Sequence, residues 1–236
     1  MSNILIIGGT SSIAVGFIRH YLLNGDVCAA VSRRPKDAVF QQDKNLEWIQ
    51  ADLSHASGMV AFKNALSLRE TQPIDTLICC IGYTGPQDGS QNWPTITAEA
   101  AARVLHVNVI TPCLAVQAAL PRILLSRAPR IVFLGSKAGS STLRGKLPHH
   151  IPGGNVWFRI SKAALHNVAV QLAYDLAIKG VAIGVLHPGW IASESNGYQG
   201  TDDLGVNVAK MIKIIASLDA ATPPTILGPD GNIIPW

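Results

Sequence analysis

A turn rich in glycine and serine near the N-terminus has the composition of a phosphate-binding loop. Gly8-Gly9-Thr10-Ser11-Ser12 follows a short apolar run, and an amphipathic pattern begins directly behind it. Gly8 permits a tight turn, small side chains let the backbone approach a pyrophosphate, and the free N–H groups of a first helical turn attract an anion. A glycine-rich dinucleotide fingerprint would place Gly where Ser12 and Ala14 stand. The turn therefore favours nucleotide binding, and an ordinary glycine-rich turn is the alternative.

The end of the next apolar run bears on which dinucleotide would bind. It reads Val31-Ser32-Arg33-Arg34 and contains no acid. In dinucleotide-binding folds an Asp or Glu at this point accepts a hydrogen bond from the ribose 2′-hydroxyl of NAD, whereas the 2′-phosphate of NADP needs cations. Guanidinium groups suit a phosphate. The sequence predicts NADP here, and a solvated arginine pair in a loop is the alternative.

These residues require a framework in which short strands alternate with helices. Seven apolar runs of strand type occupy residues 4–7, 27–31, 46–50, 76–81, 131–134, 182–186 and 225–227. Helical periodicity is found at residues 13–22, 56–70, 98–125, 156–179 and 203–217, with a short helix near 36–42. This alternation predicts an α/β fold, a Rossmann-type doubly wound parallel sheet of about seven strands with helices on both faces. No linker or repeat interrupts residues 1–236, so we expect one domain.

Two long loops should overhang the ligand-binding edge of that sheet. Residues 83–97 and 139–154 both follow strands and contain several glycines or prolines. Open α/β sheets bind ligands outside the carboxyl ends of their strands. The large side chains that would line an apolar pocket there are Tyr83, Trp93, Leu143, Leu147, Ile151, Trp157, Trp190 and Tyr198. They do not specify a substrate.

Composition excludes several classes of protein. Of 236 residues, 48% are hydrophobic and 14% charged, with 21 Gly and 14 Pro, which is too apolar and turn-rich for a disordered chain or a coiled coil. The net charge is +4, and the basic residues are scattered. That charge is too weak for a nucleic-acid surface but suits a small anionic ligand.

Cysteine usage and hydropathy bear on the compartment. The four cysteines show no CxxC or Cys/His spacing, so no metal site is expected and a reduced, cytoplasmic protein is the plainest interpretation. The apolar stretch at residues 4–7 is far shorter than a signal-peptide core. The uncharged run at 104–121 is interrupted by His106, Asn108 and Gln117, and we interpret it as a buried helix and not a membrane span.

Further motifs occur in a characteristic order along the chain. Beyond the turn at residues 8–14 they are Ala51-Asp52-Leu53-Ser54, Cys79-Cys80-Ile81-Gly82, Val107-Asn108-Val109-Ile110, Ser136 after an apolar run, Pro188-Gly189-Trp190-Ile191 and the ending at 228–236. Together they resemble the short-chain dehydrogenase/reductase family, and the C-factor and sniffer-type carbonyl reductases within it. The likeness covers essentially the whole chain. It implies that Asp52 lies near the adenine and that Asn108 and Ser136 hold catalytic positions. Of the family's Asn-Asn-Ala-Gly segment only Gly82 is kept.

The main departure from the family lies at the catalytic centre. Its Tyr-x-x-x-Lys motif corresponds to Phe158-Arg159-Ile160-Ser161-Lys162. In the family the lysine lowers the pKa of the phenol and holds the nicotinamide ribose, the phenol exchanges a proton with the substrate oxygen, and the serine orients that oxygen. A benzene ring exchanges no proton, whereas Lys162 is retained on the same helix face, four residues on. The resemblance therefore implies cofactor binding with a weakened or altered active site.

The resemblance and the motifs together define the expected site. The catalytic set is Asn108, Ser136, Phe158 and Lys162. The expected cofactor-binding residues are Gly8, Ser11, Ser12, Ile13, Ser32, Arg33, Arg34, Asp52, Leu53, Gly82, Asn108, Lys162, Pro188, Gly189 and Ile191. Ser136 as a plain strand-end serine and Asn108 as a structural cap or kink near Pro112 are the alternatives. Cys79 and Cys80 are interpreted as core residues.

Three interpretations of function remain open from the sequence. The first is an NADP-dependent oxidoreductase of carbonyl reductase or alcohol dehydrogenase type acting on a small carbonyl or alcohol. The second is an NADP(H)-binding sensor or interaction protein that has lost turnover, and the third is an introduced substitution at Phe158. His149, His150 and Tyr198 are candidates for a replacement proton donor, with exposed loop residues as the alternative.

The helices around residues 104–125 and 158–177 are expected to form a subunit interface. Their apolar positions are more numerous than one buried stripe needs. These positions include Leu114, Val116, Leu165, Val168 and Leu172. The family resemblance implies assembly through the same two helices, so we expect a homodimer or homotetramer. Trp236 is expected to pack onto the domain or onto a neighbouring subunit.

Overall fold

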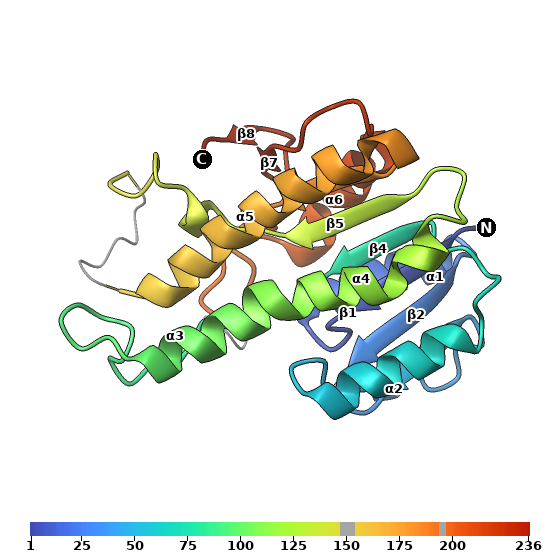
Figure 1. The fold of residues 1–236 in the computed structure, drawn as a ribbon, viewed down its shortest axis with the longest axis horizontal. Helices are drawn as coiled ribbons and strands as arrows, with labels where there is room; N and C mark the ends of the chain where they lie inside the picture. Colours follow the sequence, from blue (N-terminus) through green and yellow to red (C-terminus); the bar gives the residue numbers. More distant parts are fainter. Residues whose placement is uncertain (147–153, 194–196) are drawn as a thin grey trace.

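The chain folds around one twisted sheet whose strands run mostly parallel (Figure 1). A computed structural model describes residues 1–146, 154–193 and 197–236. The strands are β1 (Asn3–Ile7), β2 (Val27–Ser32), β3 (Leu46–Gln50), β4 (Thr76–Cys79), β5 (Arg130–Leu134), β6 (Ala182–Leu186), β7 (Ile226–Leu227) and β8 (Ile233–Ile234). Their order in the sheet is β3-β2-β1-β4-β5-β6-β7-β8. The predicted Rossmann-type doubly wound fold is thereby confirmed.

Strand β8 is the one strand that the hydrophobic pattern did not predict. It pairs antiparallel with β7, with Ile226 opposite Ile234, while all other pairs are parallel. The two strands are joined by a tight turn in which the Gly228 N–H donates to the Asn232 carbonyl at 2.8 Å. Two residues are too few to show a strand periodicity, so only the turn-forming Gly-Pro-Asp-Gly-Asn sequence hinted at a hairpin.

Helices cover both faces of the sheet. They are α1 (Ser12–Leu23), α2 (Ala56–Ser67), α3 (Ala98–Leu105), α4 (Thr111–Ile123), α5 (Val156–Leu176) and α6 (Leu204–Ser217), with short 3₁₀ turns at Ala38–Phe40, Lys137–Gly139 and Ala177–Lys179. In Figure 1, helices α2, α4 and α5 lie in front of the sheet, and α1 and α6 lie behind it. The expected helices at 36–42 and 56–70 are thus shorter than the sequence pattern indicated.

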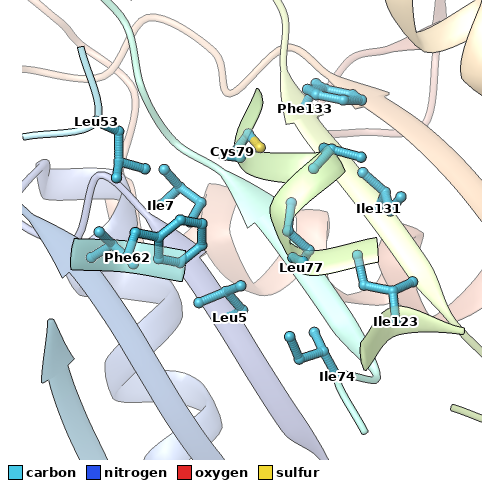
Figure 2. Packing of buried hydrophobic residues seen from close by; sticks show 14 of the residues in the cluster. Leu5, Ile7, Leu53, Phe62, Ile74, Leu77, Cys79, Ile123, Ile131 and Phe133 are labelled. Atoms are coloured by element: carbon cyan, nitrogen blue, oxygen red, sulfur yellow. The ribbon is translucent and has the colours of Figure 1, made fainter. Parts of the chain in front are cut away.

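Alternation along each strand divides the core into two apolar layers. Leu5, Ile7, Leu77 and Phe133 pack under α2, α4 and α5, as Figure 2 shows, whereas their sequence neighbours face α1 and α6. Cys79 belongs to the first layer and Cys80 to the second. Burial raises the pKa of both thiols well above their usual range. The two cysteines are therefore core residues and not nucleophiles.

The long apolar stretch at 98–125 is not a single regular helix. It divides into α3, a π-helical turn at His106–Ile110, and α4. Ala98–Ile123 is, within the described chain, the one helix long and apolar enough to cross a membrane by length and composition. It is buried on one side only, since Asn108 is fully buried while Ile110 and Leu114 are exposed. The expectation of a buried helix holds for that inner side.

The apolar positions taken as a subunit interface divide between core and surface. Val116 and Leu165 are 1% exposed and pack into the layer beneath α4 and α5. Their inclusion in the interface was wrong, because the sheet already covers them. Val168 and Leu172 are partly buried, and Leu114 is 38% exposed. The surplus of apolar side chains was therefore smaller than the sequence indicated.

Candidate functional site

The expected site residues gather at the carboxyl edge of the sheet. Each of β1, β2, β4, β5 and β6 is followed directly by one of the motifs, and α5 contributes Phe158 and Lys162. Because neighbouring parallel strands end at the same edge, motifs distant in sequence become adjacent there. Leu53 is an exception in part, since its side chain packs into the core and leaves only its backbone for a ligand (Figure 2).

The turn between β1 and α1 has a backbone geometry that can bind an anion. Gly8 has φ +93°, and a Cβ atom there would lie 3.1 Å from the Cys80 carbonyl carbon, so glycine is required. Ser11 caps α1 by accepting a hydrogen bond from the Ala14 N–H at 3.2 Å. Among the described hydrogen bonds, none engages the N–H groups of Ser12 and Ile13. These two donors at a helix start can bind a phosphate.

The end of β2 joins the turn to a basic surface. The buried Ser32 hydroxyl lies 3.2 Å from the Thr10 hydroxyl and accepts from the Arg34 N–H at 3.1 Å. Ser32 therefore links the phosphate turn to the loop that carries both arginines. Arg33 is exposed beside it. The arrangement presents a guanidinium group, and no carboxylate from β2, to a ligand at this point.

Asp52 lies in the turn between β3 and α2, at the same edge of the sheet. Its Oδ1 accepts from the Ser54 hydroxyl at 2.6 Å and from the Ser54 N–H at 3.0 Å. Partial burial acts to raise the pKa of this carboxyl, but the Ser54 hydrogen bonds and the charges of His55 and Arg33 outweigh it and hold the pKa below its usual range. Asp52 is therefore ionised and close enough to Arg33 to feel its charge.

The side chain of Lys162 is held by a backbone carbonyl of β5, since position 158 provides no hydroxyl group. Its side chain is 5% exposed, and Nζ donates to the Leu134 carbonyl at 2.8 Å. Nζ lies 5.8 Å from the centre of the Phe158 ring. A Cβ atom on Gly82 would come within 3.8 Å of the same Nζ. The structure thus brings Gly82, Phe158 and Lys162 together, and burial lowers the pKa of Lys162 to about 8.

Ser136 stands at the end of β5 and opens a 3₁₀ turn. Its Oγ accepts from the Ala138 N–H at 3.1 Å, and its own N–H donates to His166 Nε2 at 3.2 Å. Burial, with Lys162 and His187 nearby, lowers the pKa of His166 to about 4, so the imidazole is neutral and can accept through Nε2. His166 was not among the site residues expected from the sequence, although it follows Lys162 by one helical turn on the same face.

Asn108 fastens the loop after β4 to α5. Its side-chain amide donates to the Tyr83 carbonyl at 2.9 Å and to Ser161 Oγ at 2.8 Å, and its Oδ1 accepts from the Tyr83 N–H at 2.8 Å. Ser161 Oγ in turn donates to the Phe158 carbonyl at 2.7 Å. Both amide hydrogens of Asn108 are thus engaged within the protein. The side chain acts as a clamp, and not as the simple cap or kink weighed from the sequence.

The Pro-Gly segment after β6 borders a polar cavity of about 360 Å³. Gly189 has φ +92°, and a Cβ atom there would lie 2.4 Å from Asp202 Oδ2. Ile191 forms a bridge with Asp202. The cavity is lined by Lys137, His187, Gly189, Trp190, Asp202, Asp203, Asn207, Lys210, Pro229 and Asp230. Among the described side chains that were expected to form an apolar pocket, Trp190 is the one that lines this cavity.

The candidate replacement proton donors receive no support from the structure. His149 and His150, together with Leu147 and Ile151, lie outside the described residues. Tyr198 is 70% exposed.

Trp236 packs on the domain: its ring meets the His166 ring at a centroid distance of 5.8 Å, and its carbonyl accepts from the Thr142 N–H at 2.8 Å.

Comparison with known proteins identifies the family. A model of the family described as short chain dehydrogenase matches residues 2–203. The chain belongs to this family. The chain is similar to C-signal of Myxococcus xanthus, which is 26% identical over 166 residues, covering 70% of this chain and 95% of C-signal. A 1-hydroxy-2-glutathionyl-2-methyl-3-butene dehydrogenase of Rhodococcus is 28% identical over 57% of this chain and 58% of its own length.

Solved structures share the whole fold. The carbonyl reductase Sniffer of D. melanogaster superposes with a TM-score of 0.85 at 19% identity, and all of both chains is covered. An NADPH-bound carbonyl reductase from chicken fatty liver gives 0.84 at 21% identity, covering 100% of this chain and 99% of that one. These likenesses, with the C-signal match, confirm the predicted relationship to the C-factor and sniffer-type branch.

Proposed function

We propose that the protein is an NADP-dependent oxidoreductase that transfers hydride between the nicotinamide and the carbon of a carbonyl or alcohol, with an active site weakened by Phe158. One observation carries this proposal: the buried amine of Lys162, held at 2.8 Å by the Leu134 carbonyl, remains beside position 158 and Gly82 at the ligand-binding edge. Burying an amine costs free energy, so its presence at this edge indicates a role beyond the stability of the fold.

The residues at the edge fit NADP. The donors of Ser12 and Ile13 suit the diphosphate, and Arg33, with Arg34 next to it, suits the 2′-phosphate. Lys162 would hold the hydroxyls of the nicotinamide ribose. The solved carbonyl reductases of this fold include one bound to NADPH and one in complex with NADP.

The chain's own residues would orient the substrate and not protonate it through position 158. The bound cofactor supplies hydride chemistry. The Ser136 hydroxyl would donate to the substrate oxygen, and the Lys162 ammonium stabilises negative charge that develops nearby. Phe158 holds no proton to give, so the proton must come from another group or from water. A positioned general acid is worth about 10²- to 10⁴-fold, so slow turnover is expected.

A nucleotide-binding sensor or interaction protein is the second candidate function, and Phe158 is the observation that favours it. Steady-state NADPH oxidation against a panel of ketones and aldehydes, with binding measured in parallel by nucleotide fluorescence, separates the two. We expect tight binding with slow oxidation. Binding without any oxidation would instead support the sensor. The third interpretation, an introduced substitution at Phe158, is tested by comparing this chain with the coding sequence of its source.

We further propose a cytoplasmic homodimer or homotetramer of single-domain subunits, with no nucleic-acid or membrane partner. The outward sides of α4 and α5 carry exposed apolar side chains, among them Leu114 and Tyr174, and the π-helical turn adds Ile110. Their burial between subunits would be favourable. Light scattering at micromolar concentration should give a mass of two or four chains, and a monomer would contradict the proposal.

A further inference from the structure

Helix α5 begins without a cap of its own. Asn155, which precedes it, adopts the left-handed conformation with φ 55° and ψ 42°, and its side chain makes no capping hydrogen bond. The first N–H groups of a helix have no partner within the helix and need acceptors from elsewhere. These N–H groups belong to the turn that carries Phe158.

Gln91, from the loop at 83–97, supplies those acceptors. Its backbone carbonyl accepts from the Val156 N–H at 3.1 Å, and its side-chain Oε1 accepts from the Phe158 N–H at 3.3 Å. Gln91 is only 2% exposed. A residue 67 positions away in sequence therefore caps the helix at the position where the family carries its proton donor.

The orientation of the Gln91 amide is fixed by its other half. Nε2 donates to the Thr84 carbonyl at 2.8 Å and to the Pro86 carbonyl at 2.9 Å, so Oε1 must face α5. Gly85 lies between these two acceptors with φ +91°, and a Cβ atom there would come within 2.4 Å of the amide. The loop is thus wrapped closely around the Gln91 side chain.

We propose that Gln91 is a positioning residue, which caps α5 from the 83–97 loop and thereby fixes residue 158 relative to Lys162 at the reacting centre. The inference rests on the proposed function, because position 158 matters only if chemistry occurs beside it. Asn108 fastens the same loop to Ser161, so the loop holds α5 at two points within its first two turns. Small displacements of a catalytic group cost large factors in rate.

The test uses F158Y as a reporter of that position. The phenol introduced by F158Y should ionise below its usual pKa of about 10, because Lys162 lies beside it. The ultraviolet difference spectrum between F158Y and the parent isolates this phenol from the native tyrosines. Adding Q91M, which keeps the volume and removes the amide, should move the phenol pKa back toward 10. It should also lower kcat for carbonyl reduction by about ten-fold with little change in the KM for NADPH.

Two variants serve as rescue and control. Q91E keeps an acceptor for the Phe158 N–H. Burial beside the Thr84 and Pro86 carbonyls favours its protonated form, which can donate to one of them, so Q91E should restore part of the phenol shift and of kcat. Q87M removes a glutamine of the same loop whose amide donates only within it, to the Gly85 carbonyl at 3.1 Å, and should change neither quantity.

The proposal is overturned if Q91M, made in the F158Y background, gives the same phenol pKa and the same kcat as Q87M in that background. If circular dichroism shows that Q91M does not fold, G85A combined with F158Y tests the same displacement, since its methyl group presses on the Gln91 amide. A phenol pKa equal to that of F158Y alone would then contradict the proposal as well. The titration requires no turnover. Failure to reduce any carbonyl would therefore refute the proposed function while the phenol pKa still decides the role of Gln91.

Discussion

The cofactor side and the catalytic side of the sheet edge are held in different ways. On the cofactor side, Gly8 and Gly9 donate to the Val31 carbonyl of the adjacent strand and Ser11 caps its own helix. On the catalytic side the contacts are made across long distances in sequence, Asn108 to Ser161 and Lys162 to Leu134. The first region is thus held by its own helix cap and by the neighbouring strand β2, whereas the second depends on the packing of α5. Under the proposed function, nucleotide binding and proton transfer would therefore be separable, and we expect Phe158 to affect only the second.

The largest effect should come from restoring the proton donor. F158Y adds one phenol hydroxyl near Lys162 and should raise carbonyl reduction by about ten-fold or more, given the usual worth of a general acid. Nucleotide affinity should scarcely change, because the added oxygen lies far from the phosphate turn. Both quantities follow from stopped-flow NADPH oxidation and fluorescence titration on the same samples.

F158L is the matched control, since it alters the same position without supplying a proton. It should show no gain. If F158Y also shows none across a broad panel while NADPH still binds, the catalytic side is not limited by the proton donor and the sensor interpretation is favoured.

Acid should destabilise the catalytic side through its buried histidines. The pKa of His166 and that of His187 are lowered by burial to about 4, whereas an unfolded histidine titrates near 6.5. Between these values the unfolded chain binds more protons than the folded one, so the free energy of unfolding falls as the pH drops from 6.5 toward 4. Each histidine would contribute a loss on the order of 3 kcal/mol.

The variant H166Q isolates one of these two contributions. Glutamine can still accept from the Ser136 N–H and does not titrate. Denaturant melts at pH 7, 5.5 and 4.5 should show a smaller loss on acidification for H166Q than for the parent. An equal loss in both would mean that His166 is not kept neutral by the fold.

The smallest effect concerns cofactor choice. The parent should bind NADPH more tightly than NADH by about ten-fold, because Arg33 can pair with the 2′-phosphate. S32D combined with R33A should reverse the preference, with R33A alone removing it. Titration of nucleotide fluorescence gives the affinities, and K44A, at an exposed lysine in the following loop, is the control. Equal affinities in the parent would remove the argument.

The sequence predicted the shape of the turn after β1 better than the contacts that hold α5, for a physical reason. Turns such as residues 8–14 and the arginines after β2 act through their own backbone and side chains, so their types and spacing carry the information. Gln91 gave no signal, because a glutamine in a loop shows its partner only after folding. The π-helical turn around Asn108 was likewise hidden in a continuous apolar pattern.

The fold itself was predictable except for very short strands and for the extent to which the sheet covers each helix. All seven apolar runs contain a strand, although β7 is reduced to two residues, and β8, also of two residues, shows no period. Val116 and Leu165 looked available for a partner because helical periodicity does not show how widely a sheet covers a helix. For the same reason the sequence suggested a larger apolar surface than the chain exposes.

The hydrogen bond from Lys162 to the Leu134 carbonyl has a further consequence for ligand binding. A free lysine side chain loses about 2 kcal/mol of rotamer entropy when it is fixed. Here that freedom is lost during folding, because Nζ is bound to the end of β5 before a nucleotide arrives. Under the proposed function, a nicotinamide ribose would therefore meet a donor already in place, and this part of the cofactor site would be preorganised whatever residue stands at 158.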